Sequence, residues 1–131
     1  ERIFTYMQSV EVEAERDGYV KTVLGRRRYF RNLKDMTGYQ KAALLRSAVN
    51  APIQGTSADI VKLAMLRVHE ILKDYQAQLL LQVHDELVFE VPPDEIEELQ
   101  PKIKAAMESA LDLSVKLEVD IHTGKNWMEA K

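Results

Sequence analysis

The chain contains no cysteine, which excludes a disulfide framework and any metal site built on thiolates. No apolar run approaches the ~18 residues that a transmembrane helix needs, and no secretory signal is visible. Repeats, linkers and low-complexity stretches are also missing from its 131 residues. The first residue is Glu1, not Met, and it leads directly into a helical pattern. We therefore expect one domain with a sizeable core, cut from a longer chain, that does not enter a membrane.

The charges are sorted along the chain. The formal net charge is only -3. Residues 16–46, however, carry nine basic and two acidic side chains, a balance of +7, whereas residues 84–131 carry twelve acids and five bases, a balance of -7. Such asymmetry points to a basic half that binds a polyanion, although chance clustering on a solvated surface would give the same counts.

Hydrophobic periodicity predicts an α+β fold, a small antiparallel sheet with helices packed on it. A helix is expected over residues 1–17, ended by Gly18, followed by a hairpin over residues 19–30 and a loop. Pro52 is expected to separate a helix over residues 39–50 from one over about 57–75, which Thr56 or Ser57 would cap with Asp59 in its first turn. A second hairpin (79–91), a helix after Pro92 and Pro93, and an alternating strand (115–122) complete the prediction.

His84, Asp85 and Glu86 interrupt two strongly apolar strand patterns. Carboxylates at a tight turn can reach a metal or a substrate while the flanking strands fix them on a buried sheet. A polar hairpin tip is also common without any function. Because successive strand residues point to opposite faces, Asp85 and Glu86 are not expected to bind one ion together. A two-ion site would need another carboxylate, and the best internal candidate, Asp120, is expected to face solvent.

Arg46, Asn50 and Gln54 form a second candidate set. The spacing of four places Arg46 and Asn50 on one helical face, and Gln54 lies just beyond Pro52. A guanidinium with two amides suits the minor-groove acceptors of DNA, which read geometry more than sequence. An ordinary polar helix face is the alternative.

Three ordered motifs resemble the C-terminal end of family A DNA polymerases, the bacterial DNA polymerase I type. They are Gly25 to Tyr29 (GRRRY), Arg46 to Ile60 (RSAVNAPIQGTSADI) and Gln82 to Leu87 (QVHDEL). The resemblance runs over the whole chain, to the terminal Gly124-Lys125-Asn126-Trp127 segment. It implies a partial polymerase palm with an edge of the fingers, residues 1–45 forming the fingers-to-palm segment and residues 46–131 the palm.

The resemblance also implies roles for individual residues. Asp85 corresponds to the family's second catalytic aspartate, a ligand of two magnesium ions, and Glu86 to the adjacent supporting acid. His84 and Gln82 correspond to contacts near the primer terminus. Arg46, Asn50 and Gln54 correspond to minor-groove readers of the nascent base pair and of the template–primer behind it. The basic hairpin residues Arg26, Arg27 and Arg28 would lie near the template path, and Asp59 would be structural.

Several family features are not found in these residues. The first catalytic aspartate, the fingers helix that holds the nucleotide phosphates, and the thumb are absent from the sequence. Two positions depart from the family pattern: Leu45 stands where an acid usually precedes the arginine, and Arg31 stands where a proline often follows the hairpin. Leu45 puts in doubt an ion pair that would orient Arg46.

The expected function is therefore that of a fragment of a template-directed DNA polymerase, inactive alone. In the intact enzyme it would add deoxynucleotides to a primer 3′-hydroxyl with two magnesium ions, completed by an outside carboxylate. Its partners would be primer–template DNA and deoxynucleoside triphosphates, in a bacterial cytoplasm at the nucleoid, and an unpaired sheet edge could let the fragment self-associate. A non-enzymatic duplex-binding module and a metal-dependent nuclease built on His84 and Asp85 are the alternatives.

Overall fold

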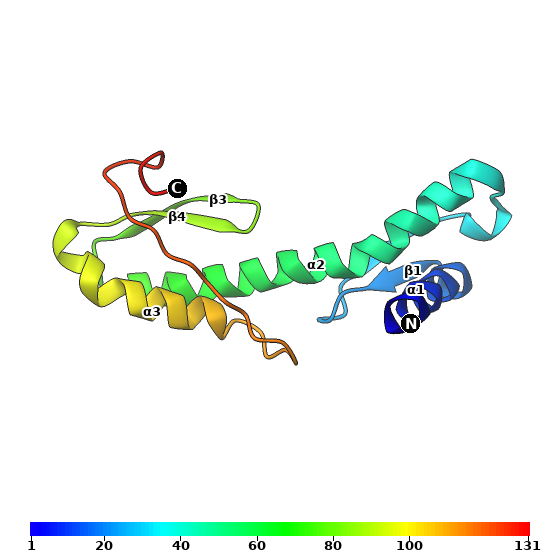
Figure 1. The fold of residues 1–131 in the computed structure, drawn as a ribbon, viewed down its shortest axis with the longest axis horizontal. Helices are drawn as coiled ribbons and strands as arrows, with labels where there is room; N and C mark the ends of the chain where they lie inside the picture. The colour runs from blue at the N-terminus through cyan, green and yellow to red at the C-terminus, as the bar shows by residue number, and fades with distance from the viewer. The chain divides into compact units, whose positions relative to one another are not determined.

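The computed structural model describes all residues from Glu1 to Lys131, which form two compact units, Glu1–Asp59 and Ile60–Lys131. Helices and two small antiparallel sheets make up the chain, so the α+β prediction is confirmed (Figure 1). The expected single sheet is instead two separate two-stranded hairpins. None of the helices combines the length and the apolar character that a membrane span requires.

The first unit begins with helix α1 (Arg2–Asp17), which ends where the sequence predicts. Gly18 adopts a left-handed φ of 73° and its N–H donates to the Ala14 carbonyl at 3.0 Å, a common way to close a helix. Strands β1 (Tyr19–Lys21) and β2 (Arg27–Tyr29) then pair antiparallel, and a short 3-10 helix, η1 (Leu33–Asp35), follows. The buried cluster of this unit consists of Val10, Ala14, Val20, Phe30, Leu33, Ala48 and Ala51.

Helix α2 (Gly38–Leu72) runs unbroken through Pro52, so the predicted break is wrong. Proline removes one helical donor and disfavours helical geometry in Ala51. Tertiary packing outweighs this local preference, because Ala48 and Ala51, which precede the proline, are both buried in the core of the first unit. The predicted cap at Thr56 or Ser57 is therefore also wrong, and Asp59 lies inside the helix rather than in its first turn.

The second unit is built around the hairpin of β3 (Gln78–Val83) and β4 (Glu86–Glu90). After the hairpin, a 3-10 turn, η2 (Pro93–Glu95), leads into helix α3 (Ile96–Glu108). Val68 and Leu72 at the end of α2 pack with Leu99 and Ile103 of α3, and Ala77 completes this buried cluster. Leu79 and Phe89 of the hairpin cover the same cluster, so the hairpin is fixed to it from one side.

The predicted strand over residues 115–122 is wrong as an element, because no hydrogen-bonded neighbour pairs with it. Its alternation is nevertheless visible: Leu117, Val119 and Ile121 are half-buried, while the polar residues between them are exposed. The segment runs back across the second unit as an extended chain toward the C-terminus (Figure 1). Pattern alone predicts which side of a strand is apolar, but pairing depends on a partner distant in sequence.

Candidate metal-binding hairpin and nucleic-acid interface

The β3–β4 hairpin turns on only two residues, His84 and Asp85. Val83 pairs with Glu86, so Glu86 is the first residue of β4 rather than part of the turn. His84 adopts a left-handed φ of 53°, as tight two-residue hairpins require. The Gln82 side-chain amide donates to the His84 carbonyl at 2.6 Å and fastens the turn to β3.

The two carboxylates at this tip are available to a ligand. His84, Asp85 and Glu86 are all exposed, and neither acid forms an ion pair. Because Asp85 belongs to the turn, the strand alternation that would separate it from Glu86 does not apply. No group of three or more His, Asp or Glu side chains gathers in a metal-holding arrangement, and Asp120 is exposed as expected. The tip therefore offers two oxygen-donor side chains and no third.

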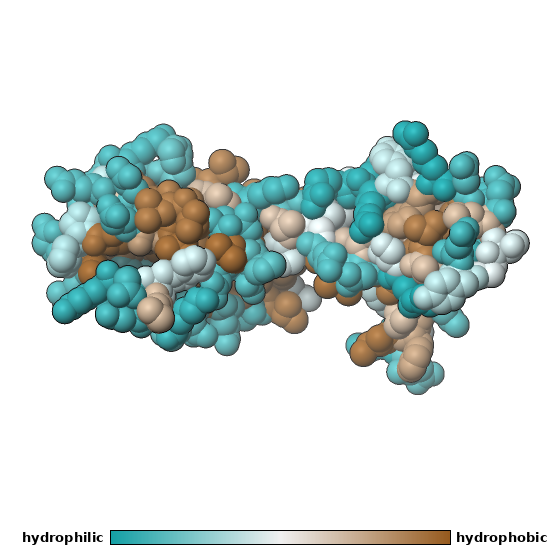
Figure 2. Space-filling view, turned by 90° about the horizontal axis from the view of Figure 1, so that it is seen from above, coloured by the Kyte–Doolittle hydropathy of each residue, from teal (hydrophilic) through white to brown (hydrophobic).

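A β-bulge lies between the hairpin's packed base and its tip. Leu79 pairs with Phe89 and Leu81 with Val88, which leaves Leu80 as the extra residue in β3. A bulge increases the local twist and turns the strand beyond it, so Leu80 re-aims the distal part of the hairpin relative to the core. Leu80 is 51% exposed. Apolar surface gathers over the part of the molecule where this hairpin lies (Figure 2).

Acidic residues near the start of α3 anchor the base of the hairpin. The Glu95 carboxylate accepts the backbone N–H groups of Gln76 and Ala77 at 2.8 and 3.0 Å, immediately before β3. Glu98 accepts the Tyr75 hydroxyl at 2.9 Å and lies 3.2 Å from the Lys102 ammonium. These donors lower the pKa of Glu98 below its ordinary value, the Tyr75 hydrogen bond most strongly. Sequence reasoning assigned neither acid its contacts with residues 75–77, because these partners lie 18 to 23 positions away in the sequence.

In the first unit, Arg46, Asn50 and Gln54 are all exposed on α2. Because α2 is continuous, the two spacings of four residues align all three along one helical face. The Arg46 guanidinium lies 5.9 Å from the centre of the Tyr39 ring, which is about two turns earlier on the same helix. The structure thus extends the predicted pair into a row of three.

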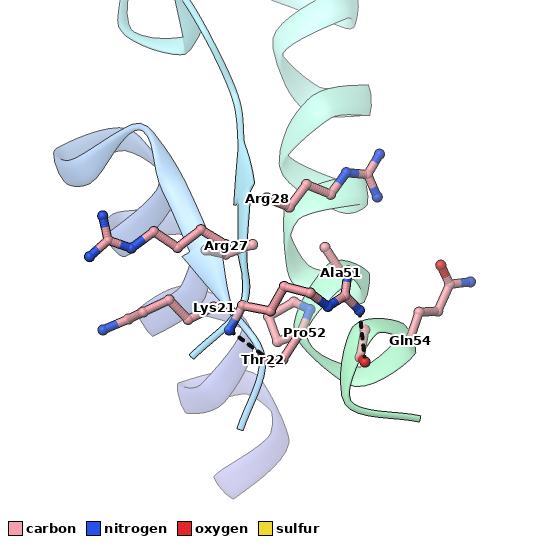
Figure 3. Close-up of a pocket in the computed structure, with 10 residues that line it drawn as sticks. Lys21, Thr22, Arg27, Arg28, Ala51, Pro52 and Gln54 are labelled. Carbon is pink, nitrogen blue, oxygen red and sulfur yellow. Dashed lines mark hydrogen bonds between the residues drawn. The ribbon is translucent and has the colours of Figure 1, made fainter. Parts of the chain in front are cut away.

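The basic β1–β2 hairpin lies beside this helix within the first unit. Its arginines and Gln54 are among the residues that line a cavity of about 230 Å³ (Figure 3). The Arg27 guanidinium stacks 4.4 Å from the Tyr19 ring centre, and that of Arg28 lies 5.3 Å from the Phe30 ring centre. The Tyr29 hydroxyl, and then the Tyr19 phenol, raise the pKa of Arg27, whose guanidinium is in any case always charged in a protein.

Arg26 differs from its two neighbours because it turns toward α2. Its Nε lies 2.8 Å from Asp59 Oδ1, and its Nη2 donates to the Gly55 carbonyl at 3.1 Å. Thr22 donates its hydroxyl to the other Asp59 oxygen at 2.7 Å. Asp59 is only 6% exposed, and sequence reasoning gave it no partner. No local signal could identify the contacts of Asp59, since they join residues more than thirty positions apart.

The structure also shows the surroundings of Leu45 and Arg31, the two positions that depart from the family pattern. Leu45 is half-buried and packs against the buried cluster of the first unit, so it contributes apolar contact where an acid was expected. Arg31 is exposed immediately before η1. Arg31 forms no ion pair, and with leucine at position 45 Arg46 has no carboxylate partner either.

Comparison with known proteins finds the same family along the whole chain. The family described as DNA polymerase family A matches residues 1–129. DNA polymerase I of Synechocystis sp. is 51% identical over 148 residues, which cover 99% of this chain and 15% of that protein. The thermostable DNA polymerase I of Thermus filiformis is 44% identical over 130 residues, covering 99% and 16%. The chain thus spans about a sixth of the length of these relatives.

A solved structure is similar in both fold and sequence. It is the POL domain of Pol1 from M. smegmatis in complex with DNA primer-template and dNTP. The TM-score is 0.91 at 45% sequence identity, with 97% of this chain and 23% of that chain covered.

Proposed function

The chain belongs to DNA polymerase family A, and from this membership we propose that it forms the palm, with an edge of the fingers, of a template-directed DNA polymerase. Residues 1–45 supply the fingers-to-palm segment with the basic hairpin, and residues 46–131 supply the palm. The intact enzyme adds deoxynucleotides to a primer 3′-hydroxyl. The segment alone is inactive, because it lacks a carboxylate to complete the metal site and a helix to bind the triphosphate.

One observation carries the proposal: Asp85 and Glu86 are exposed, free of ion pairs, and mounted on a hairpin whose base is packed on a core. Carboxylate oxygens are the ligands that magnesium prefers, and magnesium commonly uses one or two of them plus substrate phosphates. The residues therefore fit a shared site that an outside carboxylate completes. When bound there, two magnesium ions lower the pKa of the attacking hydroxyl and stabilise charge on the leaving pyrophosphate.

The chain's own side chains bind and orient DNA. His84 positions the primer terminus, and Gln82 assists by holding the His84 carbonyl in place. The row of Arg46, Asn50 and Gln54 donates hydrogen bonds to minor-groove acceptors, which all base pairs share and which therefore report correct geometry. Arg27 and Arg28, the exposed arginines of strand β2, contact the phosphate backbone near the template path.

Primer–template DNA and deoxynucleoside triphosphates are accordingly the partners we propose. The similar Pol1 domain was solved with both a DNA primer-template and dNTP, and the relatives are bacterial DNA polymerases I. We place the intact protein in the bacterial cytoplasm at the nucleoid. The segment on its own self-associates through the unpaired edges of its two-stranded hairpins.

The test is Asp85→Asn in the full-length protein, which keeps the shape of the side chain but removes its charge. Primer extension should fall by orders of magnitude, while the affinity for primer–template and the melting temperature stay near those of the unchanged protein. Asp120→Asn is the matched control, because Asp120 is also an exposed aspartate of the same unit and we assign it no metal. Near-normal extension by Asp85→Asn would remove Asp85 from the mechanism.

The alternatives give different results in the same assay. A nuclease built on His84 and Asp85 would shorten labelled DNA in a magnesium-dependent way and incorporate no nucleotide. A duplex-binding module would bind DNA with strong salt dependence, since each neutralised phosphate steepens the slope, but would show no chemistry.

A further inference from the structure

Asp59 is the only charged side chain that the fold buries, at 6% exposure. Burying a carboxylate is unfavourable unless it is paired and hydrogen-bonded. Both of its oxygens have partners: Oδ2 accepts the Thr22 hydroxyl at 2.7 Å, and Oδ1 lies 2.8 Å from Arg26 Nε. Asp59, a buried carboxylate of α2 with a partner on each oxygen, therefore holds the loop between β1 and β2 against the helix.

Further contacts tie the same loop to the same turn of α2. Arg26 Nη2 donates to the Gly55 carbonyl at 3.1 Å, and the Arg26 N–H donates to Thr22 Oγ1 at 3.2 Å (Figure 3). The Val23 N–H donates to Thr56 Oγ1 at 3.0 Å. A Cβ on Gly55 would lie 2.5 Å from Thr22 Cγ2, so the two segments are already in closest contact. We call this set the Asp59 clasp (Thr22, Val23, Arg26, Gly55, Thr56 and Asp59).

The clasp divides the three consecutive arginines into two kinds. The charge of Arg26 is balanced by Asp59. Arg27 and Arg28 have no carboxylate partner and are exposed, lying against aromatic rings instead. In Figure 3 the side chains of Arg27 and Arg28 leave the cavity in different directions, and Gln54 extends from α2 just before the clasped turn. Of these three arginines, only Arg27 and Arg28 carry charge that a polyanion can neutralise without first breaking an ion pair.

We propose that Asp59 is a positioning residue for DNA binding: the clasp withholds Arg26 from DNA and holds the hairpin that carries Arg27 and Arg28 in a fixed position beside Gln54. This rests on the proposed function, in which that surface binds primer–template DNA. Preorganised contacts cost less conformational entropy on binding than contacts from a loose loop. Releasing the clasp therefore weakens DNA binding although no clasp side chain touches DNA.

The opposite assignment is that Arg26 contacts a phosphate and Asp59 merely neutralises it. The two assignments differ in the salt dependence of binding, because each phosphate contact adds about 0.9 to the slope of log K against log salt. A residue that acts through position changes the affinity at every salt concentration but leaves the slope unaltered.

The experiment measures primer–template affinity of the full-length protein over a range of salt concentrations. Arg27→Gln and Arg28→Gln should each reduce the slope by about 0.9. Arg26→Gln should leave it unchanged while weakening affinity by roughly threefold to tenfold, a fraction of the worth of a charged hydrogen bond. Asp59→Asn should weaken affinity similarly, with a slope no lower than the starting one. The double variant of Arg26 and Asp59 should bind no more weakly than the weaker single variant.

Three controls separate positioning from loss of fold. Glu15→Gln removes one negative charge and one ion pair, that with Lys41 at 2.9 Å, elsewhere in the same unit, and should change neither affinity nor slope. Thr22→Ser keeps the hydroxyl and should bind normally, whereas Thr22→Val, of nearly equal size, should resemble Asp59→Asn. The KM for nucleotide should stay constant in all of these variants, and their melting temperatures show that each is folded.

The outcomes also separate this proposal from the function on which it rests. If the unchanged protein neither extends primers nor binds DNA in a salt-dependent way, the proposed function fails. If it does both, but Arg26→Gln lowers the slope as much as Arg27→Gln, or Asp59→Asn binds like the unchanged protein, only the clasp proposal is overturned.

Discussion

Replacing Gly55 with alanine would test how closely the β1–β2 loop packs on α2. Gly55 lies inside a helix and does not adopt a left-handed φ. In a helix interior alanine is favoured over glycine by about 1 kcal/mol. On helix propensity alone the substitution would stabilise the first unit, so only a steric conflict can reverse the sign.

The structure supplies that conflict. The added Cβ would lie 2.5 Å from Thr22 Cγ2 and 3.4 Å from Arg26 Nη2, whereas carbon atoms in contact normally stay about 3.5–4.0 Å apart. Thr22 cannot simply rotate, because its χ1 is stiff and its hydroxyl donates to Asp59. Overpacking of this kind costs about 1–3 kcal/mol, so after the helical gain Gly55→Ala should destabilise the unit by up to about 2 kcal/mol.

Hydrogen exchange measured on peptides from residues 19–30 and 51–60 reports this local opening free energy in the full-length protein. Exchange should accelerate about tenfold for a loss of about 1.4 kcal/mol. Thr22→Ser removes Cγ2 but keeps the hydroxyl, so in that background Gly55→Ala should slow exchange instead. An equal effect of Gly55→Ala in both backgrounds would refute the packing argument, and Thr22→Ser alone provides the baseline.

Three further substitutions test other parts of the structure. Glu98 has a lowered pKa in the folded state, so its stabilisation exists above the ordinary glutamate pKa and disappears as pH falls through the folded value. Glu98→Gln should therefore lower the melting temperature slightly at neutral pH and not in strongly acidic buffer, the effect being small because the side chain is 66% exposed. Leu99 is 1% exposed in the second cluster, and Leu99→Ala should cost about 2–5 kcal/mol in a denaturant titration. Gln54→Ala should slow primer extension more than it weakens duplex affinity, because phosphate contacts dominate binding; an unchanged extension rate would contradict that role.

Local signals in the sequence are sufficient for the first helix and for both hairpins. Gly18 ends α1 as predicted because only the residue itself and the preceding turn decide that cap. The second hairpin lies where the sequence predicts it because two apolar strands flank a polar pair at the right spacing, and only the role of Glu86 differs. The polar triplet at the hairpin tip and the candidate residues on α2 are therefore identifiable from the amino-acid sequence alone.

Long-range packing decides the features that sequence reasoning missed. Pro52 stays helical because Ala48 and Ala51 are buried against residues far from them in sequence. The extended segment over residues 115–122 has the right alternation but no strand to pair with. The partners of Asp59 are 33 and 37 positions away, and no periodicity encodes such a distance. These wrong or missing predictions share one cause: each feature depends on which residue distant in sequence packs or pairs with the segment, not on the local residues.

The net charge of a sequence stretch likewise does not reveal which of its charges are free to bind a ligand, because ion pairs within the fold involve distant residues. The basic stretch from residue 16 to 46 and the acidic stretch after residue 84 differ strongly in net charge, but many of those charges are already used within the fold. Asp17, Asp59 and Glu15 each take up one cation of the basic stretch, while Glu95 and Glu98 of the acidic stretch hold the base of the hairpin. The charges left without a carboxylate or ammonium partner include Arg27, Arg28 and Arg46 on one unit and Asp85 and Glu86 on the other. A ligand must compete with the existing partner of any charged group that is already paired. The unpaired charged residues, and not the stretch of sequence with the most charged residues, should therefore dominate the salt and metal dependence of the whole protein.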